Sequence, residues 1–190
     1  MARYLKFIAI TLLIPILTGC LNSKPQAPDQ ATTMKVKSAF TTQGKIGIRT
    51  PDISESARFT WDQQVANYDI ALHDPFGRQV MHLTGQPGLA KLQLESDEQT
   101  YLAESASELM NQLLGWEVPV EHALFWIQGQ PDPNSLFTRL NATSFEQSKW
   151  QVSTLDQLLL SSGETAPRKI KLSKDQLSLT LILTDWQFPQ

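Results

Sequence analysis

The sequence predicts a mainly β domain with a helical lid: an open, incompletely closed antiparallel β-barrel whose apolar concave face is capped by short helices. Two observations predict this class. Apolar and polar residues alternate along many short segments with short connections, which is the pattern of antiparallel strands with one buried face. Between residues 105 and 128 the apolar spacing changes to that of a helix.

The chain begins with the residue order of a secretory signal peptide. In "MARYLKFIAITLLIPILTGC", Arg3 and Lys6 precede an apolar run over residues 7–17, and small residues lead into Cys20. The run is shorter than the ~20 residues that a membrane-spanning helix needs. We therefore predict a signal peptide over residues 1–19, with a buried core helix as the alternative.

Cys20 is the only cysteine of the chain, which excludes an internal disulfide. The stretch "LTGC", which it ends, resembles the lipobox of bacterial lipoproteins, in which the cysteine is acylated and becomes the mature N-terminus. Leu21, not an aspartate, follows the cysteine. That resemblance implies an acyl anchor at Cys20 and sorting to the outer membrane of a Gram-negative bacterium.

Residues 20–38 are expected to form the acylated N-terminus and a flexible tether, because "LNSKPQAPDQATTM" is rich in Pro, Gln, Ser and Thr and lacks apolar periodicity. Removal of the signal takes away two cations, Arg3 and Lys6, and no acid, so the formal charge goes from −3 to −5. This acidic balance argues against binding to nucleic acid. Residues 39–190 are long enough for one domain with a sizeable core.

About nine or ten strands follow from the positions that alternate with a period of two. Trp150 with Val152, and residues 158–160, show the pattern more weakly. The clear alternating positions are Ile46 and Ile48; Ala57, Phe59 and Trp61; Tyr68, Ile70 and Leu72; Ala90, Leu92 and Leu94; Ile170 and Leu172; and Leu177, Leu179, Leu181 and Leu183.

Two short amphipathic helices are predicted between these strands. Ser105 and Glu108 have the spacing of a capping box before the first helix, and Gly115 follows as a stop. The second helix begins after Pro119 and ends at Gly129. The apolar stripes are Ala106, Leu109, Met110 and Leu113 in the first helix, and Val120, Ala123, Leu124 and Ile127 in the second.

A sheet with this many strands must curl to bury one face, and two helices are too few to cover both faces. This reasoning predicts the half-open barrel with a helical cap. Periodicity leaves open whether side chains fill the concave face or leave a ligand cavity there.

Sequence motifs for catalysis, metal binding or cofactor binding are not found in the chain. His73, His82 and His122 lack the spacing of metal ligands. No nucleophile elbow, phosphate-binding loop or dinucleotide fingerprint occurs. We therefore predict a protein that is not an enzyme and needs no metal or cofactor, although carboxylate pairs leave no motif and a hydrolase remains an alternative.

The turn "DPFG" carries an unusual residue. Asp74, Pro75 and Gly77 are typical of the first, second and fourth positions of a type I turn, but Phe76 occupies the third, which is usually polar. Two readings stay open: the ring points into water, or it folds back over the edge of the sheet.

Several segments, in this order along the chain, resemble the LolB family of outer-membrane lipoproteins. They are "GKIGIRTP" (residues 44–51), "ARFTWDQ" (57–63), "YDIALHDPFG" (68–77), "LLGWEVPVEHALFWIQGQP" (113–131) and "LILTDW" (181–186). Together with the lipobox they cover most of the mature chain.

The resemblance implies a monomeric receptor, lipid-anchored to the outer membrane and facing the periplasm. It implies that the protein takes acylated lipoproteins from a LolA-like periplasmic carrier into an apolar cavity and incorporates them into the inner leaflet without nucleotide hydrolysis. In this family an exposed loop with a hydrophobic residue moves the cargo into the membrane phospholipid; here that loop is Asp74, Pro75, Phe76 and Gly77. Candidate cavity residues are Ile46, Ile48, Phe59, Trp61, Tyr68, Ile70, Leu72, Leu109, Leu113, Leu124, Trp126 and Ile127.

Two further functions remain open besides a hydrolase. The same barrel would suit an outer-membrane lipoprotein that binds a small apolar ligand. A filled core would suit a structural lipoprotein of the cell envelope.

Overall fold

The computed structural model describes residues 34–97, 99–116 and 118–189. The expected signal peptide, Cys20 and most of the expected tether lie outside the described residues. The elements are β1 (Ala39–Arg49), β2 (Ser54–Gln64), β3 (Asn67–His73), β4 (Gln79–Gln86), β5 (Leu89–Leu94), β6 (Thr100–Ala103), α1 (Ala106–Leu114), α2 (Val120–Trp126), β7 (Phe137–Asn141), β8 (Ser144–Gln147), β9 (Trp150–Leu159), β10 (Thr165–Lys174) and β11 (Leu177–Gln187).

The eleven strands form one antiparallel sheet in the order β6-β5-β4-β3-β2-β1-β11-β10-β9-β8-β7. Each neighbour in this order is also a neighbour along the chain, except that β1 pairs with β11. Within the described part of the chain, β6 and β7 are the two free edges, so the sheet is not closed. The predicted fold class is therefore confirmed.

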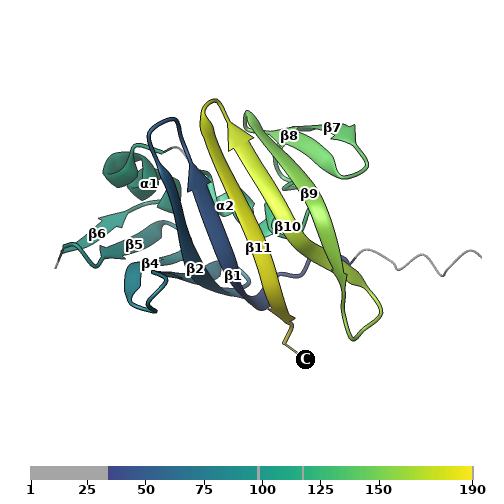
Figure 1. Cartoon of the computed structure of the whole chain (residues 1–190), viewed down its shortest axis with the longest axis horizontal. Coiled ribbons are helices and arrows are strands. Elements are labelled where there is room, and N and C mark those ends of the chain that lie inside the picture. The colour runs from purple at the N-terminus through teal and green to yellow at the C-terminus, as the bar shows by residue number, and fades with distance from the viewer. Residues whose placement is uncertain (1–33, 98, 117, 190) are drawn as a thin grey trace, which may run out of the picture. The chain divides into compact units, whose positions relative to one another are not determined.

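Both helices lie on the same side of the sheet, behind the strands in Figure 1. The sheet curls around this side: β1 and β11 stand upright in the view, whereas β5 and β6 run nearly across it. Helix α1 packs on β5 and β6, and Trp126 at the end of α2 lies 6.2 Å from Trp150 of β9, measured between ring centroids. The helices thus cover the concave face from the β5–β6 side to the β9 side.

The core lies between the helices and the inner face of the sheet. The predicted alternation is correct here: in β11, Leu179, Leu181 and Leu183 face inward while Ile182 is exposed to 37%. Each large apolar side chain that is fully buried stabilises the fold by about 1.5–3 kcal/mol. One continuous cluster runs through the strands and both helices, so the domain has a single core.

Both predicted helices are present, but α2 ends at Trp126, with Ile127 as its C-cap, and so is shorter than the predicted helix that ends at Gly129. Ser105 caps α1 through its Oγ, which accepts a hydrogen bond from the backbone N–H of Glu108 at 3.1 Å. Gly115 ends α1 in the left-handed region with φ +69°. Helix α2 begins directly after Pro119, as predicted.

The structure has eleven strands, not nine or ten. Four of them, β4, β6, β7 and β8, contain none of the alternating positions on which the prediction rested, and the two weak candidates at 150–152 and 158–160 both belong to the region of β9. The hairpin of β7 and β8 lacks the expected alternation altogether. All five residues of β7 are exposed. In β8 the buried residues include polar Ser144 and Gln147 beside Phe145. A pattern of apolar residues therefore does not mark this hairpin.

Residues just before β1 contact the domain. The side chain of Met34 is 2% exposed, and its backbone N–H donates to the carbonyl of Thr165 at 2.9 Å. Lys37 and Gln128 exchange two hydrogen bonds, from the Lys37 N–H to Oε1 at 2.8 Å and from Nε2 to the Lys37 carbonyl at 2.9 Å. The chain therefore reaches β1 along the end of α2.

Candidate functional site

The turn between β3 and β4 is held rigidly by Asp74. Its Oδ1 accepts hydrogen bonds from the backbone N–H groups of Phe76 at 2.8 Å and Arg78 at 3.0 Å. The Gly77 N–H donates to the Asp74 carbonyl at 3.0 Å, which closes the predicted turn. The Arg78 guanidinium lies 2.7 Å from Oδ2 of Asp74. Five consecutive residues are therefore fixed in one conformation.

The charge on Asp74 follows from the same contacts. Desolvation acts to raise the pKa of Asp74, but the hydrogen bonds from the backbone and side chain of Arg78, its positive charge and the Phe76 N–H outweigh it. The pKa of this carboxyl therefore lies below its ordinary value, and it stays ionised at neutral pH.

Phe76 points into solvent. Its side chain is 89% exposed. The sequence left open whether the ring points into water or folds back over the sheet edge, and in the structure it points into water. Because the turn beneath the ring is rigid, little further order is lost when the ring enters an apolar phase. The Phe76 turn, residues 74–77, is thus a fixed apolar projection.

The twelve candidate cavity residues come together on the inner face, apart from the Phe76 turn. They all belong to the single apolar cluster of the domain. Six are buried, namely Phe59, Trp61, Ile70, Leu109, Trp126 and Ile127, and six are partly buried, namely Ile46, Ile48, Tyr68, Leu72, Leu113 and Leu124. They also pack against residues outside this set: the Trp61 ring lies 5.9 Å from that of Phe40, and the Trp126 ring 6.2 Å from that of Trp150.

Tyr68 is the titratable side chain among these twelve residues, and its pKa is shifted. Burial, and secondarily the negative charge of Glu121 on α2, raises the pKa of Tyr68 to about 12. Its ring lies against β4, because a Cβ atom at Gly85 would come within 2.0 Å of it. Tyr68 is therefore a neutral part of the inner face under α2.

A pocket of about 410 Å³ opens at the edge of the inner face. Its walls come from the β1–β2 and β10–β11 turns, the α1–α2 connection and β9, and its apolar lining includes Trp116, Trp150 and Leu177. Trp150 is 1% exposed, and its Nε1 has no hydrogen-bond partner in the described part of the chain. Since an unsatisfied buried donor costs about 1–3 kcal/mol, a ligand oxygen that accepted a hydrogen bond from this N–H would be stabilised there. No sequence pattern predicted that Trp116 and Trp150 line a common pocket. We call this pocket the mouth pocket.

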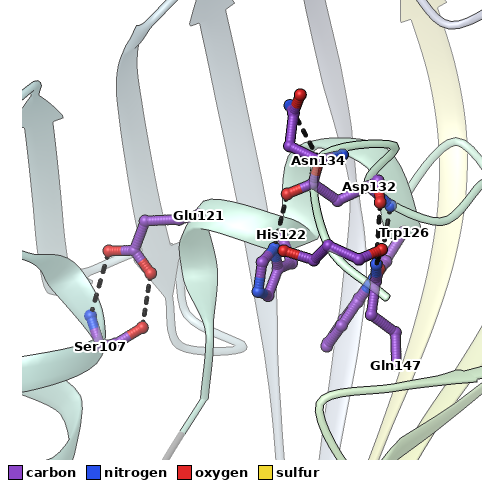
Figure 2. Close-up of polar contacts among 8 residues, drawn as sticks. Ser107, Glu121, His122, Trp126, Asp132, Asn134 and Gln147 are labelled. Carbon is purple, nitrogen blue, oxygen red and sulfur yellow. Dashed lines mark hydrogen bonds and ion pairs between the residues drawn. The ribbon is translucent and has the colours of Figure 1, made fainter. Parts of the chain in front are cut away.

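Helix α2 is fixed by buried polar contacts (Figure 2). Trp126 Nε1 donates to Oε1 of Gln147 at 2.7 Å, and the same oxygen accepts from the Asp132 N–H at 2.9 Å. Nε2 of Gln147 donates to the carbonyls of Asp132 and Ser135. His122 Nδ1 lies 2.7 Å from Oδ2 of Asp132. These bonds join α2 to the loop before β7 and to β8.

Helix α1 is tied to α2 through Glu121. One oxygen of Glu121 accepts a hydrogen bond from the Ala106 N–H at 2.9 Å. The other accepts from the Ser107 hydroxyl (Figure 2). The remaining contacts of α1 are with β5 and β6 and with the apolar cluster. The N-terminus of α1 is therefore positioned by α2, and its body by apolar packing.

The described residues contain no group of three or more His, Cys, Asp or Glu side chains arranged to hold a metal ion. Of the histidines, His82 pairs with Asp69 at 2.9 Å and His122 with Asp132. No helix in the described ranges has the length and apolar character needed to cross a membrane.

Comparison with known proteins supplies the context for this arrangement. The family described as Outer membrane lipoprotein LolB matches residues 38–186. The outer-membrane lipoprotein LolB of Pseudomonas syringae pv. syringae (strain B728a) is 34% identical and covers 97% of each chain. That of Pseudomonas paraeruginosa (strain DSM 24068 / PA7) is 38% identical over 78% of this chain and 74% of its own.

Solved structures give a similarity of fold alone. A LolA superfamily protein from Nitrosomonas europaea superposes with a TM-score of 0.51 at 10% sequence identity, covering 84% of this chain and 90% of its own. The two proteins therefore share a fold at a sequence identity too low to show a common role.

Proposed function

Because the chain belongs to the LolB family of outer-membrane lipoproteins, we propose that it receives acylated lipoproteins from a LolA-like periplasmic carrier and incorporates them into the inner leaflet of the outer membrane. The cargo chains occupy an apolar cavity during transfer, and the process needs neither catalysis nor nucleotide hydrolysis. The protein acts as a monomer.

The exposed ring of Phe76 is the observation that carries this proposal. Aromatic and aliphatic side chains favour the boundary between headgroups and acyl chains. Phe76 is 89% exposed on a turn fixed by Asp74, so it reaches that boundary without refolding of the domain. Insertion of the ring brings the domain against the bilayer that accepts the cargo.

The apolar inner face of the sheet is the site that would hold the acyl chains of the cargo. Each methylene that leaves water is worth about 0.8 kcal/mol, so the acyl chains of a lipoprotein must pass from one apolar environment to another. We place their first contact at the mouth pocket of Trp116, Trp150 and Leu177. There the unpaired Nε1 of Trp150 donates to an ester or amide oxygen of the acylated cysteine, while the chains advance between the helices and the sheet.

Transfer direction follows from the order of apolar environments. The chains leave the carrier for this inner face and then enter the bilayer, which accommodates them without displacing packed side chains. An acyl anchor at Cys20 and the tether that follows it keep the domain close to that bilayer throughout.

The test uses the mature acylated protein in proteoliposomes, as wild type and as Phe76→Glu. Carrier-bound radiolabelled lipoprotein is added, and its distribution is measured between the carrier, the receptor (by crosslinking) and the bilayer (by resistance to alkaline extraction). We expect both proteins to take the cargo and only wild type to deliver it. Delivery by Phe76→Glu should fall at least tenfold, because placing a charge where the ring enters the bilayer costs about 2–3 kcal/mol.

Leu136→Glu is the matched control, since Leu136 is 97% exposed in the loop before β7 and is equally free to accept a charge. It should deliver as wild type does. Equal loss in both variants would remove the special role of Phe76. If wild type does not take cargo, the alternative functions are favoured: binding of a small apolar ligand, or a structural role in the cell envelope.

A further inference from the structure

The outer face of the sheet carries a row of cations beside the Phe76 turn. Lys45 of β1 stands directly opposite Arg58 of β2, and Arg58 stands opposite His73 of β3. Their chain neighbours Ile46 and Phe59 belong to the apolar cluster, so Lys45 and Arg58 point to the other face. Both cationic residues are exposed.

No ion pair of Lys45 or Arg58 is found among the described residues. The ion pairs among the described residues involve Arg78, Arg168, His82 and His122, and none includes Lys45 or Arg58. Like charges directly opposite each other on neighbouring strands are destabilising. Although the chain has a formal charge of −3, two adjacent cations therefore stand here without an acidic partner in the part of the chain that the structure describes.

The cations line a groove of about 480 Å³ that reaches the Phe76 turn, because Gly77 is also part of its wall. The groove runs past Gly44, where β1 bulges and a Cβ atom would lie 1.9 Å from the carbonyl oxygen of Ile182. The other polar lining residues are Gln43, Thr60, His73 and Thr184, and the Thr184 hydroxyl donates to the Gln43 carbonyl at 3.1 Å. Two cations and the Thr60 hydroxyl beside a groove suit an anionic oxygen ligand.

We propose that this groove is a headgroup site of the membrane-docking surface, in which Lys45 and Arg58 bind the phosphates of anionic phospholipids while Phe76 enters the bilayer. The occupant is a lipid surface because the groove continues into the Phe76 turn, and an apolar ring flanked by cations matches the bilayer boundary in both polarity and charge. The inference rests on the proposed function, since it assigns that membrane contact a lipid preference.

The test measures vesicle binding by the mature chain, residues 20–190 with Cys20→Ser, which keeps every described residue and lacks the acyl anchor. Sedimentation with vesicles of phosphatidylcholine alone, or mixed with phosphatidylglycerol, gives the affinity at low salt. Each Lys or Arg near an anionic bilayer contributes about fivefold in affinity. Lys45→Gln/Arg58→Gln should therefore bind the mixed vesicles about 25-fold more weakly, and wild-type binding should weaken with added salt.

Lys91→Gln/Lys149→Gln is the control, because it removes the same charge from positions outside the groove. It should bind as wild type does. Thermal unfolding verifies that all variants are folded. Loss of like-charge repulsion should leave the midpoint of the Lys45/Arg58 variant equal to or above that of wild type.

Cargo uptake from the carrier is measured on the same proteins. Equal binding to both vesicle types, or equal loss in the two double variants, overturns the headgroup site. Loss of cargo uptake with unchanged vesicle binding also overturns it and assigns the groove to an acidic carrier surface. If wild type takes no cargo but its vesicle binding depends on Lys45 and Arg58, the headgroup site stands and the receptor function fails.

Discussion

Helices α1 and α2 cover the same concave face but are held there by different interactions. Helix α2 is joined by hydrogen bonds to β8 through Gln147, to the loop before β7 through Asp132, and to the start of the domain through Gln128. The side-chain hydrogen bonds that α1 makes to other elements, within the described ranges, go to Glu121 and Val118, and its contact with β5 and β6 is apolar.

The difference bears on the proposed entry of acyl chains. Directional hydrogen bonds in a low-dielectric core are lost when a helix moves, and each unsatisfied group then costs about 1–3 kcal/mol. Apolar contacts are exchanged for contacts with an acyl chain at little net cost. We therefore expect the α1 side to yield during loading while α2 stays in place.

The largest effect is expected for Gln147→Leu. Gln147 is 1% exposed and satisfies Trp126 Nε1, the Asp132 N–H and carbonyl, and the Ser135 carbonyl. Loss of these hydrogen bonds in Gln147→Leu should lower the free energy of unfolding by about 4 kcal/mol, measured by urea denaturation. Gln93→Leu, on the exposed face of β5, should change it by less than about 0.5 kcal/mol. A similar small effect of Gln147→Leu would mean that α2 is not held by this network.

An intermediate effect separates the two helices directly. Leu109→Ala in α1 and Ile127→Ala at the end of α2 both truncate buried side chains, 1% and 2% exposed, and each should cost about 3 kcal/mol. Only Leu109→Ala should increase binding of a fluorescent apolar probe, because the α1 side opens more easily. Equal probe binding by the two variants would contradict this assignment.

The smallest effect concerns the acidity of Tyr68 under α2. The unfolded chain loses the Tyr68 proton near its ordinary pKa of 10.0, whereas the folded protein keeps it to about 12. Stability should therefore fall as the pH rises from 10 to 12, because ionisation favours the unfolded state. Tyr68→Phe should flatten this part of the curve of unfolding midpoint against pH. An unchanged curve would show that the phenol is not held neutral by burial beneath α2.

Much of this architecture was predictable because it depends on periodic patterns. Strands with one buried face, such as β11, and helices with local caps, such as Ser105 and Gly115, are specified by residues close together in the chain. The family assignment from short segments is confirmed by a match over residues 38–186. The lining of a cavity and the roles of the Phe76 turn remain proposals.

The β7–β8 hairpin and the hydrogen bonds that fix α2 could not be predicted from periodic patterns. Hairpin formation there depends on Asn141, whose Oδ1 accepts from the backbone N–H and hydroxyl of Thr143 in the turn. Burial of Gln147 depends on partners that approach from α2 and the following loop, up to 21 residues away. A polar residue gives no sign of burial when the groups that satisfy it are brought by tertiary structure.

The two free edges of the sheet, β6 and β7, have a mechanical consequence. In a closed barrel the circumference is set by strand number and stagger, and widening it would break a ladder of hydrogen bonds. A sheet without that seam can flatten or tighten its curl while every existing ladder stays intact. We therefore expect the space at the concave face to be adjustable, as the proposed binding of lipoproteins with different numbers and lengths of acyl chains would require.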